Sequence, residues 1–393
     1  MNKIDKKKIF IISNSTFQNT HYYKFKINDL LKKYEVFIID LTKYYGSIPK
    51  FNKIKYFKNY IQFSDKEKLF KFIDLKKPNL IIDILGNNFL FKTWSIRGFF
   101  YNTNQTTLIL NRGIQPKIAY PSLDLIKIYI KNPKYFYKSL VNFLLKRIIK
   151  IIYKNVVPDY FVSSGLESDY QRYKKKKYFL YSYDYENYLS YKNKKRLIKK
   201  KYALFIDENI IYHPDNFNSN YPKPPATKQR YYKSLVKFFL KFQKINKVKV
   251  IIALHPTTNK KIANNFKPIK KYFNLTGRLL RDAKFVLIHS STTKHIAAAY
   301  KKPLLFLTSD EINKSWFSNY IKQNSELFNS KIINIDDYDE KIEKYKIEKE
   351  KYSRFIDNYV VHPKFKYKKK NYLKIINTIM NNEWIINNQS STW

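Results

Sequence analysis

Short apolar runs alternate with segments of helical length along this chain, and this alternation restricts the fold more than any other feature of the sequence. Runs of this length, bounded by polar residues, are typical of buried strands. Joined by helices, they predict parallel sheets covered on both faces, with right-handed crossover connections. The nine runs are Lys8–Ile12, Val36–Asp40, Asn79–Leu85, Thr107–Leu110, Asp159–Val162, Tyr202–Ile206, Val248–Leu254, Lys284–Ile288 and Leu304–Leu307.

The pattern occurs twice, which predicts an α/β protein with two Rossmann-like domains that face each other across a cleft. We expect an N-terminal domain over residues 1–183, a Lys-rich linker over 184–201 and a second domain over 202–365. Residues 366–393 are expected to include a C-terminal helix that packs back on the first domain. Ligands of such sheets bind beyond the carboxyl ends of the strands, so the residues that follow each run are the candidates for function.

Polar clusters follow three of the predicted strands in the second half. They are Asp207 to Asn209, His255 to Thr258 and His289 to Thr293. Because the carboxyl ends of parallel strands share one edge of a sheet, we expect the three clusters to converge there.

The hydroxyl cluster from Ser290 to Thr293 precedes a predicted helix at 292–300. Hydroxyls and free N–H groups at a helix N-terminus can bind a phosphate, which is the interpretation that we favour. The alternative is a simple N-cap, for which one hydroxyl would be enough. A second predicted helix, over 226–244, has Thr227 as its expected N-cap.

His255 and Pro256 follow a continuous apolar strand, and the proline restricts the turn. An imidazole there can donate to a phosphate oxygen and stabilise a departing nucleotide. A loop histidine bonded to backbone is the alternative, since His-Pro also occurs at His213 and His362.

The adjacent acids Asp207 and Glu208 should point to opposite sides of their strand, so that one of them faces the cleft. That carboxylate could act as a general base, whereas a solvated turn or a helix cap is the structural alternative. On the acceptor side the weaker candidates follow strands of the first half: Asn14, Ser15, Asn87, Asn88 and Arg112.

Several kinds of chemistry are excluded or disfavoured by the sequence. The absence of cysteine excludes disulfides, Cys-ligated zinc and thiol catalysis. No glycine-rich dinucleotide loop or P-loop is present. We predict no metal site, because His255, His289 and His295 lack compact ligand spacing. We also predict no cofactor.

The net charge of +47 admits three explanations. Only nine of the 77 basic residues are Arg, the residue best suited to phosphates and bases, and no nucleic-acid motif is present. The bias towards Lys, Asn, Ile, Tyr and Phe is what an A+T-rich genome produces, which we favour over attraction to a membrane surface. A basic nucleic-acid-binding protein is the remaining alternative.

No run approaches the length of a membrane span, and the apolar run near the N-terminus is too short for a signal peptide, so we expect a cytoplasmic location. The segment 135–153 is strongly apolar with interspersed Lys and Arg. It could lie on the inner face of the cytoplasmic membrane as a basic amphipathic helix, or pack on a sheet.

Between residues 207 and 303 the sequence resembles the CMP-sialic acid and CMP-Kdo dependent bacterial glycosyltransferases of the GT-B fold. The resemblance rests on the acidic pair, the His-Pro and the Ser/Thr group, with Asn209 where those families usually have Gly. It implies an inverting, metal-independent transfer of a sugar from a nucleotide, CMP being favoured, to a surface polysaccharide or lipo-oligosaccharide.

This resemblance also implies roles for individual residues. One carboxylate, for which we choose Asp207, would be the base, and His255 would contact the donor phosphate. Ser290, Ser291 and Thr292 would bind the phosphate or the sugar carboxylate.

Residues 284–307 also resemble the CDP-glycerol glycerophosphotransferases of teichoic-acid type, and the UDP-sugar 2-epimerases share the scaffold. All of these families use a nucleotide-activated donor.

Overall fold

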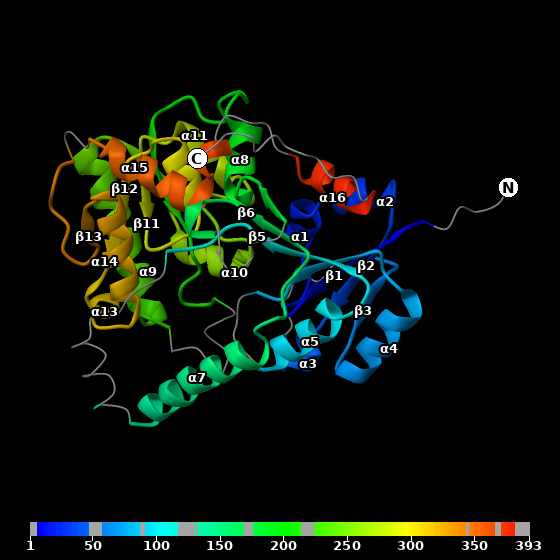
Figure 1. The fold of residues 1–393 in the computed structure, drawn as a ribbon. Helices are drawn as coiled ribbons and strands as arrows, with labels where there is room; N and C mark the ends of the chain where they lie inside the picture. Colours follow the sequence, from blue (N-terminus) through cyan, green and yellow to red (C-terminus); the bar gives the residue numbers. More distant parts are fainter. Residues whose placement is uncertain are drawn as a thin grey trace.

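The computed structural model describes residues 6–46, 57–86, 91–116, 130, 133–168, 176–213, 224–342, 346–365 and 371–381, and all that follows concerns these residues. They form two parallel sheets, each flanked by helices (Figure 1). This confirms the predicted α/β class with two Rossmann-like units. Asn87 and Asn88 lie outside the described residues.

The first sheet has seven strands in the order β3-β2-β1-β4-β5-β6-β7. The first six follow the 3-2-1-4-5-6 order of doubly wound dinucleotide-binding folds. The strands are β1 (Lys8–Ser13), β2 (Glu35–Asp40), β3 (Tyr60–Gln62), β4 (Leu80–Ile84), β5 (Thr106–Asn111), β6 (Tyr160–Ser163) and β7 (Lys177–Phe179).

Side chains of the first sheet alternate between its two faces and pack in two separate hydrophobic cores. On one face Ile9 and Ile11 of β1 belong to a cluster with residues of α2 (Ile27–Leu31) and α16 (Tyr372–Met380). On the other face Phe10 and Ile12 pack with residues of α4 (Lys66–Lys76) and α5 (Phe91–Tyr101). The remaining helices of this part are α1 (Asn19–Lys24), α3 (Thr42–Tyr45) and α7 (Pro133–Ile152).

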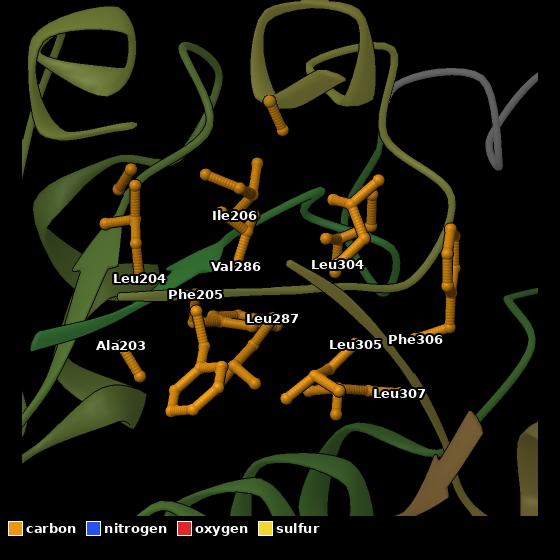
Figure 2. Packing of buried hydrophobic residues seen from close by; sticks show 14 of the residues in the cluster. Ala203, Leu204, Phe205, Ile206, Val286, Leu287, Leu304, Leu305, Phe306 and Leu307 are labelled. Carbon is orange, nitrogen blue, oxygen red and sulfur yellow. The ribbon is translucent and has the colours of Figure 1, made fainter. Parts of the chain in front are cut away.

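The second sheet has the order β10-β9-β8-β11-β12-β13, which repeats the doubly wound order. Its strands are β8 (Tyr202–Ile206), β9 (Lys249–Ala253), β10 (Lys270–Tyr272), β11 (Phe285–Ile288), β12 (Leu304–Thr308) and β13 (Ile332–Asn334). Figure 2 shows how alternation divides the side chains between its faces: Leu204 and Ile206 point to one side, Ala203 and Phe205 to the other.

Several helices surround the second sheet. They are α9 (Lys228–Asn246), α10 (Lys260–Ala263), α11 (Thr276–Asp282), α12 (Lys294–Ala299), α13 (Asp310–Asn313), α14 (Phe317–Phe328) and α15 (Lys349–Phe355). Thr227 occupies the N-cap position of α9, as predicted, but it does not cap with its side chain. Its hydroxyl and its N–H both donate to the Glu311 carboxylate instead.

Two segments connect the halves of the chain. The stretch 184–201, expected as a linker, contains most of α8 (Tyr183–Tyr191), which lies against α11 and α12. Helix α16 lies on the first sheet, where Tyr372 and Ile376 are buried and the Tyr34 hydroxyl donates to Asn377 Oδ1 at 2.8 Å. Two Rossmann-like units with a terminal helix on the first correspond to the GT-B arrangement that the resemblance implies.

No helix in the described part of the chain is both long enough and apolar enough to span a membrane.

Candidate functional site

A pocket of about 260 Å³ lies at the carboxyl edge of the second sheet, and residues of all three predicted clusters reach it. Its polar wall contains the side chains that the sequence singled out, and its apolar wall is added by loops and by the start of α14. The lining residues are Glu208, Ile210, His213, Pro225, His255, Ser290, Ser291, Thr292, Trp316 and Phe317.

Asn209 gives the turn after β8 its shape. Its φ of 51° lies in the left-handed region, which Asn tolerates better than most residues other than Gly. Its N–H donates to Asp207 Oδ1 at 2.9 Å, and its side-chain Nδ2 donates to Thr257 Oγ1 at 3.0 Å. Asn209 therefore adopts the left-handed conformation of this turn and also links the turn to the His-Pro loop.

Asp207 is buried and does not line the pocket. Besides Asn209, its carboxylate accepts from the backbone N–H of His255 at 3.1 Å and from the Thr258 hydroxyl at 2.7 Å. Burial raises the pKa of Asp207. These contacts make Asp207 the residue that fixes the loop after β9 to the end of β8. The sequence-based choice of Asp207 as the base would require its carboxylate to reach the pocket, and it does not line it.

Glu208 is the member of the acidic pair that lines the pocket. Its carboxylate accepts hydrogen bonds from the backbone N–H groups of His289, at 2.7 Å, and Ser290, at 2.8 Å. Burial raises the pKa of Glu208 to about 7, against the opposing effect of these hydrogen bonds and of the Lys294 charge. A group with this pKa can change protonation state near neutral pH.

The imidazole of His255 is held by its own turn. The Thr258 N–H donates to the His255 carbonyl at 2.9 Å, which closes a β-turn with Pro256 at the second position, the place that favours proline. Pro256 itself is exposed and does not line the pocket. Because the Thr257 N–H donates to Nδ1 at 3.2 Å, Nδ1 is an acceptor, and in the neutral ring the proton is on Nε2.

The hydroxyl cluster presents side chains rather than a helix terminus to the pocket. Helix α12 starts at Lys294 and has only six residues, and the N–H groups of residues 294–297 donate to carbonyls of residues 291–293. The hydroxyl of Ser290 accepts from Asn324 Nδ2 at 2.9 Å, and that of Ser291 accepts from the Thr293 N–H at 3.2 Å. Their O–H groups can therefore donate to a ligand.

His289, which directly precedes the hydroxyl cluster, is part of the core. Its Nδ1 donates to the Leu307 carbonyl at 2.7 Å, so its Nε2 accepts from the Tyr231 hydroxyl at 2.9 Å. Burial lowers the pKa of His289 to about 4. It is therefore a neutral structural histidine.

A buried lysine close to the pocket was not predicted to be functional. Lys294 is 2% exposed, and its Nζ donates to Oε1 of Gln115, which follows β5 of the first sheet, at 2.8 Å. Burial lowers the pKa of Lys294 to about 8, whereas the charges of Glu208 and Asp184 raise it. No sequence motif identifies Lys294, because its partner Gln115 is 179 residues away in the sequence.

His295 completes this contact between the two halves of the chain. Because Gln115 Oε1 accepts from Lys294, its Nε2 is the donor to His295 Nε2 at 3.3 Å. The proton of the neutral ring is then on Nδ1, which lies 3.5 Å from the Asp184 carboxylate. Burial lowers the pKa of His295 and raises that of Asp184 to about 6.

The acceptor-side candidates of the first sheet lie away from this pocket's lining. Arg112 is buried: its Nε donates to the Tyr181 carbonyl, it pairs with Glu186 at 2.7 Å, and its guanidinium lies 4.3 Å from the Tyr183 ring centroid. Arg112 therefore joins β5 to α8. Ser15 forms a local turn in which its N–H donates to the Ser13 hydroxyl.

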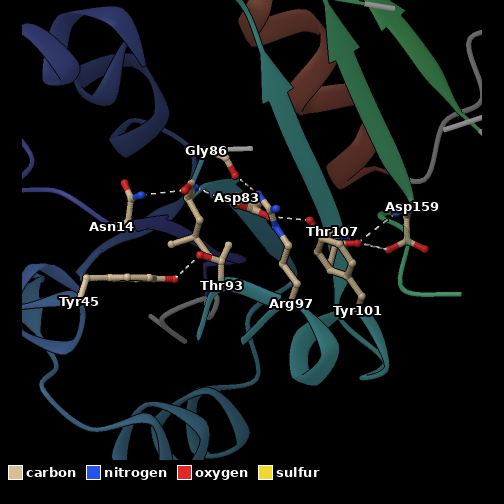
Figure 3. A network of polar contacts seen from close by, with 10 residues as sticks. Asn14, Tyr45, Asp83, Gly86, Thr93, Arg97, Tyr101, Thr107 and Asp159 are labelled. Atoms are coloured by element: carbon tan, nitrogen blue, oxygen red, sulfur yellow. Dashed lines mark hydrogen bonds and ion pairs between the residues drawn. The ribbon is translucent and has the colours of Figure 1, made fainter. Parts of the chain in front are cut away.

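Figure 3 shows the polar network that shapes the carboxyl edge of the first sheet. Asn14 Nδ2 donates to the Leu85 carbonyl at 2.8 Å. The buried Arg97 pairs with Asp83 at 2.6 Å and donates to the Gly86 carbonyl at 2.7 Å. These contacts fix the backbone after β4.

One Asp-x-Asp tripeptide, Asp337-Tyr338-Asp339, follows β13 and lies outside the pocket lining. Tyr338 is buried, and Asp339 pairs with Lys241 at 3.1 Å on the surface of α9. Within the described residues no three His, Asp or Glu side chains gather as a metal site would require. The His362 ring packs at a tilted angle against Phe179, with 4.3 Å between the ring centroids, and does not line the pocket.

No protein family and no curated protein sequence matches this chain. Among solved structures, it is similar to S. aureus MnaA with UDP, with 14% identity and a TM-score of 0.43 over 82% of this chain and 87% of that one. It is also similar to Methanocaldococcus jannaschii UDP-GlcNAc 2-epimerase in complex with UDP-GlcNAc and UDP, with 14% identity and a TM-score of 0.41 over 89% and 93%. Acinetobacter baumannii MurG gives 8% identity and a TM-score of 0.41 over 84% and 86%.

Proposed function

We propose that this chain is a GT-B glycosyltransferase that transfers a sugar from a nucleotide donor bound at the second sheet. The observation that carries the proposal is the pocket in which Glu208, His255 and the hydroxyls of residues 290–292 meet. It lies beyond the carboxyl ends of parallel strands, where ligands of doubly wound sheets bind.

The donor phosphate lies between His255 and the hydroxyl cluster. The Nε2–H of His255 and the O–H groups of Ser291 and Thr292 are hydrogen-bond donors in the pocket wall, and phosphate oxygens are acceptors. Donors that are already positioned stabilise the negative charge that develops on a leaving nucleotide. In this proposal the apolar wall at Trp316 and Phe317 accommodates the base or the sugar.

Glu208 rather than Asp207 is the proposed general base. An acceptor hydroxyl transfers its proton to the Glu208 carboxylate while its oxygen forms the bond to the anomeric carbon. The bond from that carbon to the phosphate oxygen breaks, and the nucleotide leaves with the electron pair. Attack from the side opposite the leaving group inverts the anomeric configuration.

The donor nucleotide is proposed as CMP and the transferred sugar as a sialic acid or a Kdo-like acid, because of the resemblance at residues 207–303. The reaction proposed is metal-independent on the same basis. Asn14 and Ser15 remain proposed acceptor-side residues, whereas the contacts of Arg112 assign it to the packing of α8. The acceptor is proposed to be a surface glycan or a lipid-linked glycan.

A thermal-shift screen with CMP, CDP, UDP and GDP tests the proposal. A ligand that binds only the folded protein raises the midpoint of unfolding by mass action. Stabilisation by CMP supports a CMP-sugar donor, and stabilisation by CDP favours the polyol-phosphate transferase alternative. Stabilisation by UDP alone favours another GT-B-like nucleotide-sugar enzyme, such as a UDP-sugar 2-epimerase.

A shift with none of the four nucleotides contradicts a nucleotide donor. In that case salt-dependent binding to nucleic acid becomes the explanation to test.

A further inference from the structure

Helix α7 exposes a continuous apolar face to solvent. Of the 16 large apolar side chains that are exposed in the described part of the chain, eight belong to this one helix. Tyr137, Leu140, Leu144, Ile148 and Ile151 recur at intervals of three and four residues, so they lie on one side of the helix. Their exposed fractions range from 43% to 75%.

The opposite side of α7 attaches the helix to the first domain. Ile149 is 1% exposed and belongs to a small cluster with Trp94 and Val156. The Tyr153 ring, just beyond the helix, lies 5.9 Å from Trp94, and it approaches Gly98 so closely that an added Cβ would lie 3.1 Å from the ring. Figure 1 shows α7 along the lower edge of the molecule, next to α5. The helix is thus held from one side while its apolar side faces outwards.

The basic residues of this segment indicate which kind of partner covers the apolar face of α7. Residues 133–154 contain six basic residues and no acidic one. Arg147, Lys150 and Lys154 fall together on one flank of the apolar stripe, at helical spacings of three and four. A helix with large apolar residues on one face and bases beside them binds in the plane of an anionic lipid interface.

A second copy of the same helix would be a poor occupant. Pairing two copies would bring their bases together with no acid on either helix to compensate. The helix is about 30 Å long at 1.5 Å per residue, so the whole stripe can contact one flat surface.

We propose that α7 is the membrane-docking surface of this protein and that it lies in the headgroup region of an anionic bilayer. Because the helix carries Lys and Arg within its length, it rests on the membrane and does not cross it. This inference goes beyond the proposed function and does not depend on the identity of the donor nucleotide.

Vesicle co-sedimentation of the full chain tests the proposal. We expect binding to vesicles of phosphatidylglycerol and phosphatidylcholine, and little binding to phosphatidylcholine alone. The triple variant Leu144→Ser, Ile148→Ser and Ile151→Ser should bind at least about tenfold more weakly, because it removes the side chains that enter the interface.

Two controls test whether binding depends on α7 itself and not on exposed apolar side chains or positive charge elsewhere on the protein. Leu75→Ser with Leu240→Ser changes exposed leucines outside α7 and should leave binding unchanged. Neutralising Arg147, Lys150 and Lys154 to Gln should weaken binding by about fivefold for each charge. The same change at the exposed Lys192, Lys194 and Lys195, after α8, should have a much smaller effect.

Three results would overturn the proposal. They are an absence of binding to anionic vesicles, an equal loss of binding in the control variants, and a lipid-free dimer that the triple Ser variant dissociates. The triple Ser variant should show the same nucleotide thermal shift as the unaltered protein, which would confirm that the variant is folded. A loss of vesicle binding with an unchanged nucleotide shift then concerns docking alone, and a missing nucleotide shift in both proteins concerns the proposed function alone.

Discussion

Both carboxylate oxygens of Glu208 accept a hydrogen bond from the backbone N–H of Ser290, at 2.8 and 3.0 Å. A residue that follows β8 thereby lies at the carboxyl end of β11, in the wall of the pocket. Its neighbour Asp207 turns to the other side and holds the loop after β9. The two acids therefore differ in what their replacement should do.

We expect Glu208→Gln to abolish transfer while the protein stays folded. The amide keeps the size and an acceptor oxygen for the N–H groups of His289 and Ser290, but it cannot take a proton from an acceptor hydroxyl. Loss of a general base typically lowers kcat by about 10²- to 10⁴-fold. The measurement is the transfer rate with the nucleotide sugar whose nucleotide stabilises the protein.

Asp207→Asn is the matched control for this substitution. It weakens buried hydrogen bonds to His255 and Thr258, so it should lower the free energy of unfolding by about 1–3 kcal/mol. A Glu208→Gln protein with full activity would assign the base to a different residue. One that unfolds more readily than Asp207→Asn would show that Glu208 is needed for the fold, contrary to the expectation.

The raised pKa of Glu208 also predicts how stability depends on pH. The folded state binds this proton more tightly than the unfolded state, where the pKa is near 4.5. The resulting stabilisation is present below pH 4.5 and is lost as the pH rises through about 7. The melting temperature of the unaltered protein, relative to that of Glu208→Gln, should therefore fall between pH 5 and pH 8. A constant difference would show that Glu208 titrates near its ordinary value in the folded protein.

The central strands of both sheets can be predicted from the apolar runs of the sequence, whereas the edge strands cannot. Each of the nine apolar runs overlaps a strand, but β3, β7, β10 and β13 were not predicted. Each has three residues and lies at the edge of its sheet. An edge strand has a neighbour on one side only and needs no continuous apolar run. In β10, for example, Lys270 is exposed and Tyr272 is half-buried.

The site shows the same division between local pattern and tertiary contact. The convergence of Glu208, His255 and Ser291 follows from their positions after neighbouring parallel strands. The choice between Asp207 and Glu208 does not follow from the sequence. The alternation of side chains along a strand predicts that the two carboxylates point to opposite sides, but not which of them faces the pocket. Lys294 could not be predicted either, since its partner Gln115 lies in the segment after β5, in the other half of the chain.

The hydrogen bonds of His255 predict different outcomes for two amide replacements. The Nδ1 atom accepts from the Thr257 N–H, so the proposed donor to the phosphate is Nε2–H. A Gln amide nitrogen can reach the position of Nε2, whereas Asn ends near the position of Nδ1. We expect His255→Gln to retain more nucleotide binding and transfer than His255→Asn. The nucleotide thermal shift and the transfer rate of the two variants measure the difference, and equal losses would contradict donation from Nε2.

Lys294 should set the pH at which Glu208 works. Its positive charge lowers the pKa of Glu208 and so opposes the effect of burial. Lys294→Met keeps an unbranched side chain but removes the charge, so the pKa of Glu208 should rise above about 7. Transfer needs the carboxylate form, and the acid limb of the kcat profile should therefore move to higher pH. Gln115→Ala removes the hydrogen-bond partner of Lys294 but keeps the charge, so its acid limb should stay closer to that of the unaltered protein. If both variants have the same acid limb as the unaltered protein, the charge of Lys294 does not act on the proposed base.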